Sequence, residues 1–405
     1  MLIEFRVENH RSLRDEQAIT MEAGRVGEST DTRPRKVAGH NKKLLPAAVI
    51  YGANASGKSN LLSAIAFMSE AVTQSHRSWE LHGGIPRTPF AWGEKRDKPS
   101  LFEVSLLLKG VKYVYGFVVN DEIVEEEWLF AWPKNHKQIW FEREGDKFEF
   151  GGHLKGPNEV IVEVTRPNAL FLSTAAQHRN DQLIPIYEWF HGITSMNTLR
   201  SRQPDYRPLV AEAIFFTSPT NVERLRILLS GADVGIVNVK EIEDDQKNNR
   251  RRQKKILLQH ESGNDDSWLP LEEESGGTKA LFRMAPIIFY SIDSGGLLLI
   301  DELESSLHPL LGQAIVKMFN CPKANPNNAQ IIFTTHDTNL LGTTLGEPPL
   351  RRDQIWFAEK DSEGASRIYP LTDYKPRKSE NLERGYLQGR YGAIPFLGDF
   401  SWITE

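Results

Sequence analysis

The stretch that most constrains this chain is residues 52–59, Gly-Ala-Asn-Ala-Ser-Gly-Lys-Ser, which fits the pattern G-x-x-x-x-G-K-[ST]. In that pattern a glycine-rich loop wraps its backbone N–H groups around phosphates. The flanks agree, because an apolar run over 44–51 predicts a buried strand and apolar residues at helical spacing over 61–68 predict a helix. The N-terminus of that helix would present unpaired N–H groups and a positive dipole end to an anion. The sequence therefore predicts a phosphate-binding strand, loop and helix.

Within this loop the side chains have separate predicted roles. Lys58 is placed to reach the β- and γ-phosphates of a nucleotide, and Ser59 to ligate Mg²⁺. The residues expected to contact the nucleotide here are Gly52, Asn54, Ser56, Gly57, Lys58, Ser59 and Asn60. ATP and Mg²⁺ are the predicted cofactors.

Composition limits the other classes of function. Cys321 is the single cysteine in 405 residues, which excludes an intramolecular disulfide or a cysteine-based metal cluster and suits a reducing cytosol. The net charge of −5 gives no global electrostatic reason for binding nucleic acid or a membrane. No apolar run approaches the roughly 18–20 residues that a membrane helix needs. We expect a cytoplasmic protein without a membrane segment.

Two later stretches have the character of anion and metal sites. Ser275 is a natural N-cap before an apolar helix pattern, and Gly276 and Gly277 leave the backbone amides at that helix start uncovered. The run 296–300 predicts a buried strand, and Asp301 and Glu302 follow at its carboxyl end, where open α/β sheets bind ligands. Asp301 is therefore predicted to hold Mg²⁺, and Glu302 to act as the general base that polarises the attacking water.

A third stretch, 330–335, predicts another buried strand that ends at His336. A helix expected over 310–319 separates this strand from the one that ends at Asp301. Strands arranged in this way bring their carboxyl ends to the same edge of a sheet, so His336 is predicted to contact the γ-phosphate.

The chain is predicted to have three parts and an α/β fold with a mixed central sheet. Residues 1–179 are expected to form an N-terminal lobe with the phosphate loop and a flanking antiparallel β-subdomain, because strand signals recur from 102 to 164. Residues 180–235 are expected to form a helical insertion, and 236–405 a C-terminal lobe. Residues 247–255 carry six positive charges and no acid, which predicts either a solvated loop or a contact with nucleic acid or an acidic partner.

Taken together, the four motifs in this order resemble the P-loop heads of ATP-binding-cassette type, a group that includes SMC-like, RecF-like and OLD-like proteins. Several segments are similar to the AAA_15/AAA_21 group of bacterial ATPases, namely 5–12, 274–278, 301–309 and 386–395. The resemblance implies that 275–277 correspond to the signature motif, 303–308 to the D-loop and His336 to the switch histidine. Glutamate and threonine around 275–277 depart from the transporter form of the signature.

The resemblance also implies a composite site. In such heads the signature of one copy faces the phosphate loop of another, so that ATP lies between two copies. Ser275, Gly276 and Gly277 are therefore expected to bind nucleotide held by a partner copy, in a homodimer or higher homo-oligomer. The expected activity is ATP hydrolysis coupled to dimerisation.

Three functions stay open at this point. The resemblance suggests the ATPase component of a bacterial anti-phage or abortive-infection system with a separate effector protein. The basic run and a basic tail would suit a RecF- or SMC-like ATPase for DNA repair or loading. A scaffold that binds ATP without turnover is disfavoured by Lys58, Asp301, Glu302 and His336. The tail segment 389–392 predicts a turn packed on the head.

Overall fold

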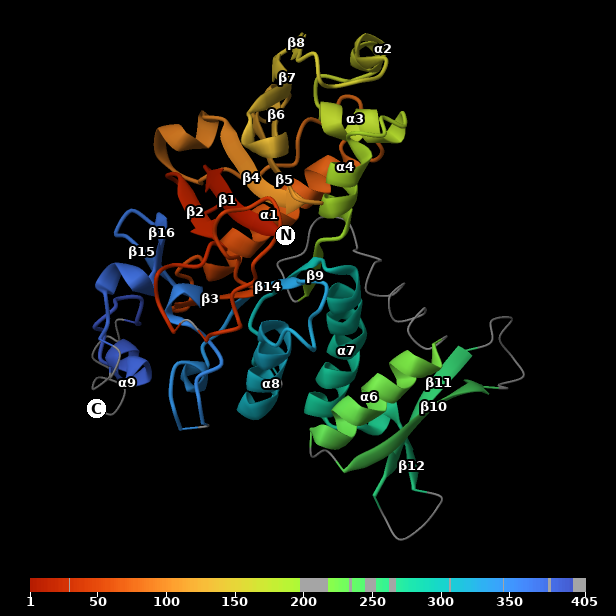
Figure 1. Cartoon of the computed structure of the whole chain (residues 1–405), viewed down its shortest axis with the longest axis vertical. Coiled ribbons are helices and arrows are strands. Elements are labelled where there is room, and N and C mark those ends of the chain that lie inside the picture. Colours follow the sequence, from red (N-terminus) through yellow and green to blue (C-terminus); the bar gives the residue numbers. More distant parts are fainter. Residues whose placement is uncertain are drawn as a thin grey trace, which may run out of the picture.

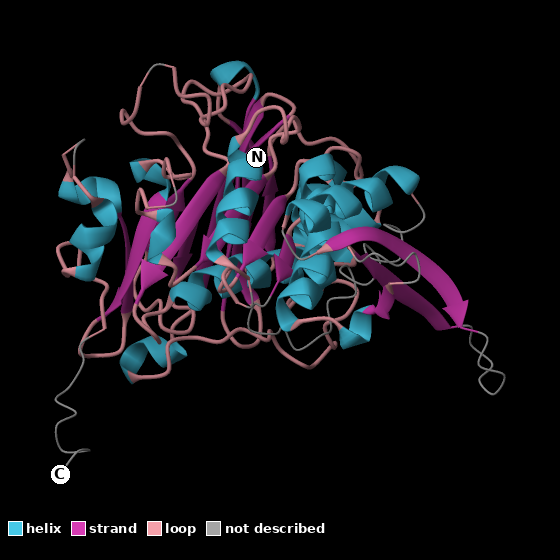
Figure 2. Cartoon of the chain, turned by 90° about the horizontal axis from the view of Figure 1, so that it is seen from below, coloured by secondary structure: helices cyan, strands magenta, loops and turns pink. Residues whose placement is uncertain are grey.

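The computed structural model describes residues 1–28, 30–196, 218–232, 235–244, 253–261, 267–305, 307–344, 346–377 and 380–395. Its centre is a six-stranded sheet in the order β16-β15-β3-β14-β13-β9 (Figures 1 and 2). The strands are β3 (Ala47–Gly52), β9 (Thr194–Met196), β13 (Leu297–Ile300), β14 (Gln330–Thr334), β15 (Ile355–Lys360) and β16 (Ser366–Pro370). Strands β3, β9, β13, β14 and β15 are parallel, and β16 is antiparallel to β15. The predicted mixed central sheet is therefore present.

Both faces of this sheet are covered, which explains why β3, β13 and β14 are continuous apolar runs. Alternate residues of β3 pack in opposite directions. Ala48 and Ile50 join a core with helix α1 (Lys58–Gln74), whereas Val49 joins a core with α7 (Gly276–Ser294) and α8 (Pro309–Asn320). The helix expected over 310–319 is therefore present as α8. The central sheet lies between these two cores.

A seven-stranded antiparallel sheet contributes to the core on the α1 side. Its order is β2-β1-β4-β5-β6-β7-β8, and this is the predicted antiparallel β-subdomain. The strands are β1 (Leu2–Glu8), β2 (Gln17–Thr20), β4 (Ser100–Leu108), β5 (Val111–Val119), β6 (Val124–Trp132), β7 (Gln138–Glu144) and β8 (Lys147–Phe150). Helices α2 (Asn158–Glu163), α3 (Phe171–Gln177) and α4 (Ile184–His191) follow it. At their edges β2 meets β16, where the backbone N–H of Ile368 donates to Gln17 Oε1 at 2.7 Å.

A three-stranded antiparallel sheet lies beside α7, away from the seven-stranded sheet (Figure 1). It consists of β10 (Ile236–Asp244), β11 (Gln253–His260) and β12 (Trp268–Pro270), with α6 (Pro219–Gly231) packed against it. The strands β10 and β11 bracket most of the predicted basic run, whose residues 247 and 250–252 lie outside the described residues.

The predicted division at residues 179 and 235 stays a prediction. The described residues between these points form α4, β9 and α6, and the expected helical positions 209–214 lie outside the described residues. The structure differs from the expectation at β9, which pairs with β13 in the central sheet. Three residues are too few to show a period of two, so the sequence carries no clear signal for this strand.

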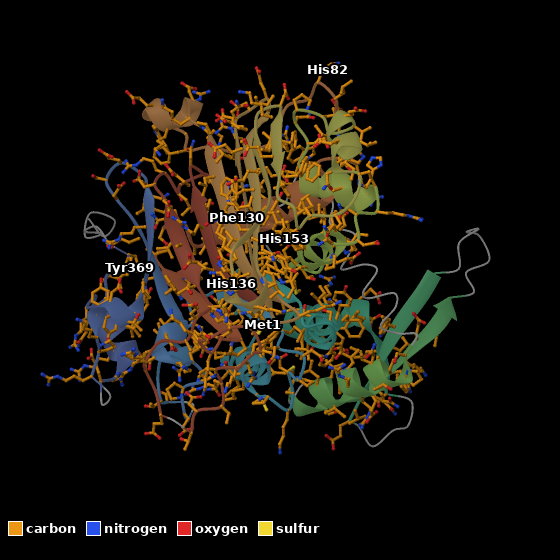
Figure 3. The ribbon with its side chains drawn as sticks, turned by 45° about the horizontal axis from the view of Figure 1, so that its top comes forward. Met1, His82, Phe130, His136, His153 and Tyr369 are labelled. Carbon is orange, nitrogen blue, oxygen red and sulfur yellow. The ribbon has the colours of Figure 1, made fainter. Side chains whose placement is uncertain are left out.

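The tail segment packs on the central sheet through aromatic rings. Helix α9 (Leu382–Leu387) places Tyr386 5.5 Å from Phe357 of β15, and Tyr391 lies 5.8 Å from the same ring. Tyr369 of β16, labelled in Figure 3, donates from its hydroxyl to the carbonyl of Tyr391 at 3.0 Å. The turn expected over 389–392 is thus packed on the head. The remaining short helices are 3₁₀ segments at Gly93–Asp97, Pro133–Asn135, Leu271–Glu273, Thr338–Leu340, Arg352–Gln354 and Leu371–Tyr374.

Candidate nucleotide site

The phosphate loop joins β3 to α1 at the carboxyl edge of the central sheet. A Cβ on Gly52 would lie 2.4 Å from the carbonyl oxygen of Ala358. Gly57 has φ +103°, and a Cβ there would lie 2.1 Å from Ser366 Oγ. Both positions therefore require glycine, the first for close approach to β15 and the second for its backbone angle as well.

The Lys58 side chain folds back over this loop. It is buried, and its Nζ donates to the carbonyls of Gly52 and Ala53, each at 2.9 Å. Burial lowers the pKa of this ammonium, and the carboxylates of Asp301, Glu302 and Glu304 oppose that shift. An anion at the loop would stabilise the charged form in the same way, which suits a residue that binds phosphate.

Two serines far apart in the sequence brace the loop. Ser366 Oγ lies 2.7 Å from the carbonyl oxygen of Ser56 and 2.7 Å from Ser12 Oγ. Because a carbonyl can only accept, Ser366 donates to Ser56 and accepts from Ser12. Asn60 Nδ2 then donates to Ser12 Oγ at 2.6 Å, so the brace ties the loop to the first turn of α1. Local sequence patterns did not single out either serine as a nucleotide-site residue.

Asp301 follows β13 directly and meets the start of α1. Its Oδ1 accepts from Ser59 Oγ at 2.9 Å and from Thr334 Oγ1 at 2.6 Å. Thr334 Oγ1 in turn accepts from the backbone N–H of Glu302 at 2.8 Å. The two residues predicted to hold Mg²⁺ are therefore in direct contact, and Thr334 is a further neighbour that sequence reasoning missed.

The donor set at this point suits magnesium. Among the described residues, no group of three or more His, Cys, Asp or Glu side chains is arranged to hold a metal ion. Mg²⁺ is characteristically bound through one or two carboxylates together with water and substrate phosphates. Asp301 and Ser59 can supply one carboxylate and one hydroxyl, so they fit an ion that reaches the protein with its nucleotide.

Glu302 and His336 also lie at the carboxyl edge of the central sheet. Glu302 is exposed and has φ +53°, in the left-handed region, so the chain turns sharply just after Asp301. The pKa of His336 is lowered, first by partial burial of the ring and then by the charge of Lys58, while three carboxylates raise it. The hydrogen bonds of Thr334 to Asp301 and to the backbone of Glu302, together with that of Ser59 to Asp301, bring the ends of β13 and β14 to the start of α1, so these side chains share one region. A neutral imidazole is the form that the lowered pKa favours.

The residues predicted to form the signature motif lie on a different element. Ser275 is the N-cap of α7, and its Oγ accepts from the backbone N–H of Thr278 at 3.1 Å. Ser275 and Gly276 are exposed, and a Cβ on Gly276 would meet no atom within 4 Å. The preceding Glu274 is buried and lies 2.5 Å from His260 Nε2 of β11. The start of α7 is thus an open surface of backbone amides.

Among the described residues, no helix has the length and hydropathy needed to cross a membrane. A search of curated proteins found no match. Among solved structures, an SMC head domain from Thermotoga maritima is 14% identical, with 91% of this chain and 98% of that chain covered and a TM-score of 0.42. An SmcHead bound to the C-winged helix domain of ScpA is 13% identical, with 92% and 99% covered and a TM-score of 0.47.

A third solved structure, an Smc head domain with an extended coiled coil bound to the C-terminal domain of ScpA derived from Pyrococcus furiosus, is 13% identical. It covers 92% of this chain and 97% of that chain with a TM-score of 0.41. The family model AAA_21, described as "AAA domain, putative AbiEii toxin, Type IV TA system", matches residues 47–342, which is more than half of the chain. The chain therefore belongs to the AAA_21 family.

Proposed function

We propose that this protein hydrolyses ATP with Mg²⁺ and that two copies close on the nucleotide. The observation that supports this most is structural. The phosphate loop with Lys58 and Ser59 and the ends of β13 and β14, which carry Asp301, Glu302 and His336, meet at one edge of the central sheet. Lys58 binds the β- and γ-phosphates, and Ser59 with Asp301 holds the magnesium ion. When bound, the ion neutralises charge that develops on the phosphate oxygens.

The protein groups share the remaining work. Glu302 is exposed beside the phosphate loop, where it orients a water molecule and accepts its proton. His336, in its neutral form, donates a hydrogen bond toward the γ-phosphate. In this proposal neither group needs to move far, because both follow strands whose carboxyl ends lie at the same edge.

The exposed start of α7 supports the composite site. Ser275 is an ordinary N-cap, and Gly276 leaves the first amides uncovered, so this surface can accept an anion that another molecule carries. We propose that it binds the nucleotide of a second copy. ATP would then join two copies, and hydrolysis would release them.

Three variants at two positions test this composite site. Glu302→Gln should bind ATP without hydrolysing it and should form a dimer with ATP and Mg²⁺, measured by light scattering after size-exclusion chromatography. In that background Ser275→Asp keeps an N-cap residue but places a negative charge against the partner's nucleotide, whereas Ser275→Asn is a neutral N-cap control. We expect Asp to abolish the dimer and Asn to preserve it. A Glu302→Gln protein that stays monomeric with ATP and Mg²⁺ would contradict the composite site.

We further propose that the ATPase acts in a bacterial anti-phage or abortive-infection system with a separate effector protein. The description of the family, which names a toxin of a type IV toxin–antitoxin system, supports this role. The test is to challenge cells that carry the native system with phage, with Lys58 intact or changed to Ala. Equal plating efficiency in both strains would refute the role in defence.

A DNA-repair or DNA-loading ATPase is the second candidate. Its support is the basic run 247–255, which follows β10 and continues into β11, together with Lys240 of β10, whose Nζ lies 3.8 Å from the ring centre of Trp268 on β12 of the same sheet. Binding to DNA should then weaken steeply as salt rises from low to physiological concentration, because counterions are released. DNA should also stimulate ATP turnover. Turnover that is indifferent to DNA favours a protein trigger.

A further inference from the structure

The loop that carries His336 is held by a carboxylate from another part of the chain. Glu304 lies three residues after Asp301 in sequence, and its side chain reaches the end of β14. Its Oε1 accepts from the backbone N–H of His336 at 2.5 Å, and its Oε2 accepts from Thr335 Oγ1 at 2.6 Å. Hydrogen bonds to an ionised carboxylate are among the stronger ones in proteins. Both oxygens of Glu304 therefore fix the same short loop.

The loop is also fixed on its far side. Thr335 Oγ1, which donates to Glu304, accepts from the backbone N–H of Asp337 at 3.0 Å. The buried Tyr51 of β3 donates from its hydroxyl to the carbonyl of Asp337 at 2.9 Å. The backbone on either side of His336 is thus tied down while the His336 side chain is exposed. The position of the imidazole depends on these backbone contacts.

The origin of Glu304 gives the contact a functional meaning. Glu302 and Glu304 belong to one short segment after β13, so a shift of this segment moves the proposed general base and the hold on His336 together. Beyond this segment, Leu307 is buried and His308 is the N-cap of α8. We propose that Glu304 is a positioning residue that couples this segment to His336, so that Glu302 and His336 reach the γ-phosphate together. This inference rests on the proposed ATP hydrolysis.

The test compares Glu304→Ala, which removes both acceptors, with Glu304→Gln, which keeps one. Glu159→Ala is the matched control, because Glu159 is an exposed glutamate on α2. In the nucleotide-free protein we expect Glu304→Ala to speed hydrogen exchange of the amides at 336 and 337 on the order of tenfold. Glu304→Gln should give a smaller increase, and exchange in α1 should stay unchanged in all three.

Kinetics provide the second measurement. Glu304→Ala should lower kcat by about 10- to 100-fold while the Kd for an unhydrolysed ATP analogue changes by less than about twofold, and Glu304→Gln should recover part of kcat. Unchanged exchange at 336–337, or an unchanged kcat, would overturn the positioning role. Absence of turnover in the wild-type protein would instead refute ATP hydrolysis, and faster exchange in Glu304→Ala would still show that Glu304 holds the loop.

Discussion

Replacing Gly57 by alanine should weaken nucleotide binding while the rest of the fold stays intact. Gly57 has φ +103°, and an added Cβ would lie 2.1 Å from Ser366 Oγ and 2.8 Å from Ser12 Oγ. A left-handed backbone angle costs an alanine about 1–2 kcal/mol. Relieving the contact requires the Ser366 hydroxyl to move, which gives up two hydrogen bonds at about 1 kcal/mol each. The Ser366 Cβ, 2.7 Å from the added atom, must shift as well.

Together these effects disfavour the native loop by about 3–4 kcal/mol, so the variant loop takes another conformation in the free protein. Part of the binding free energy of the nucleotide is then used to restore the native loop. Because every 1.4 kcal/mol is a factor of ten, the Kd for an ATP analogue should rise by about 100- to 1000-fold. Isothermal titration calorimetry measures it directly.

Two further variants separate the causes. Gly93→Ala is the control, because Gly93 has φ +62° but a Cβ there would meet no atom within 4 Å, and it lies outside the site. It should reduce stability slightly and leave the Kd unchanged. Ser366→Gly alone should weaken binding, yet it should add little to Gly57→Ala, because the alanine has already displaced the hydroxyl. Additive effects of the two changes, or a Kd for Gly57→Ala within about threefold of wild type, would refute this reasoning.

Two predictions concern stability. Glu127 is fully buried, lies 3.6 Å from the Arg143 guanidinium and accepts a hydrogen bond from the Tyr115 hydroxyl. Glu127→Ala should therefore lower the free energy of unfolding by about 3–5 kcal/mol, and Glu127→Gln should lower it by less. Urea unfolding measures both, and a loss below about 1 kcal/mol for alanine would contradict the buried-pair argument. Burial next to Ser63, helped by the charge of Arg11, lowers the pKa of His10 from its ordinary 6.5 to about 3. The unfolded chain then takes up a proton that the folded chain rejects, so stability should fall by about 1.4 kcal/mol per pH unit between pH 6.5 and about 3. His10→Gln should lack this contribution when unfolding curves are compared at pH 6.5 and 4.5.

Much of the nucleotide edge is predictable because its signals are local. The strand, loop and helix around Lys58 are contiguous, and Asp301 and His336 each follow an apolar run that parallel burial explains. Strands of this kind end at one edge of a sheet, so their carboxyl ends could be placed together before any coordinates were known.

What escaped prediction depends on contacts between distant residues. Ser12 and Ser366 are 354 positions apart and meet only because the edge strands β2 and β16 lie side by side. Strand β11 was missed for a different reason. The charges that precede it suggest a solvated loop, whereas Ile256 and Leu258 turn toward α6 and α7 as alternate residues of a strand. The local sequence contains the charges but carries no information about the helices that cover the strand.

Helix α7 has a mechanical consequence. Its nineteen residues, Gly276–Ser294, lie between the exposed cap at Ser275 and Gly295, which is two residues before β13. At 1.5 Å per residue they span about 28 Å. The chain turns toward β13 at Gly295, where φ is +69° and a Cβ would lie 2.5 Å from the carbonyl oxygen of Asn327.

A small rotation of a long helix about one of its ends is amplified at the other end. Tilting α7 by about ten degrees would carry its free end through about 5 Å, more than the length of a hydrogen bond. Helix α6 packs against both α7 and β10, so in the proposed composite site a molecule that binds α6 or the sheet β10–β12 would shift the amide cap at Ser275.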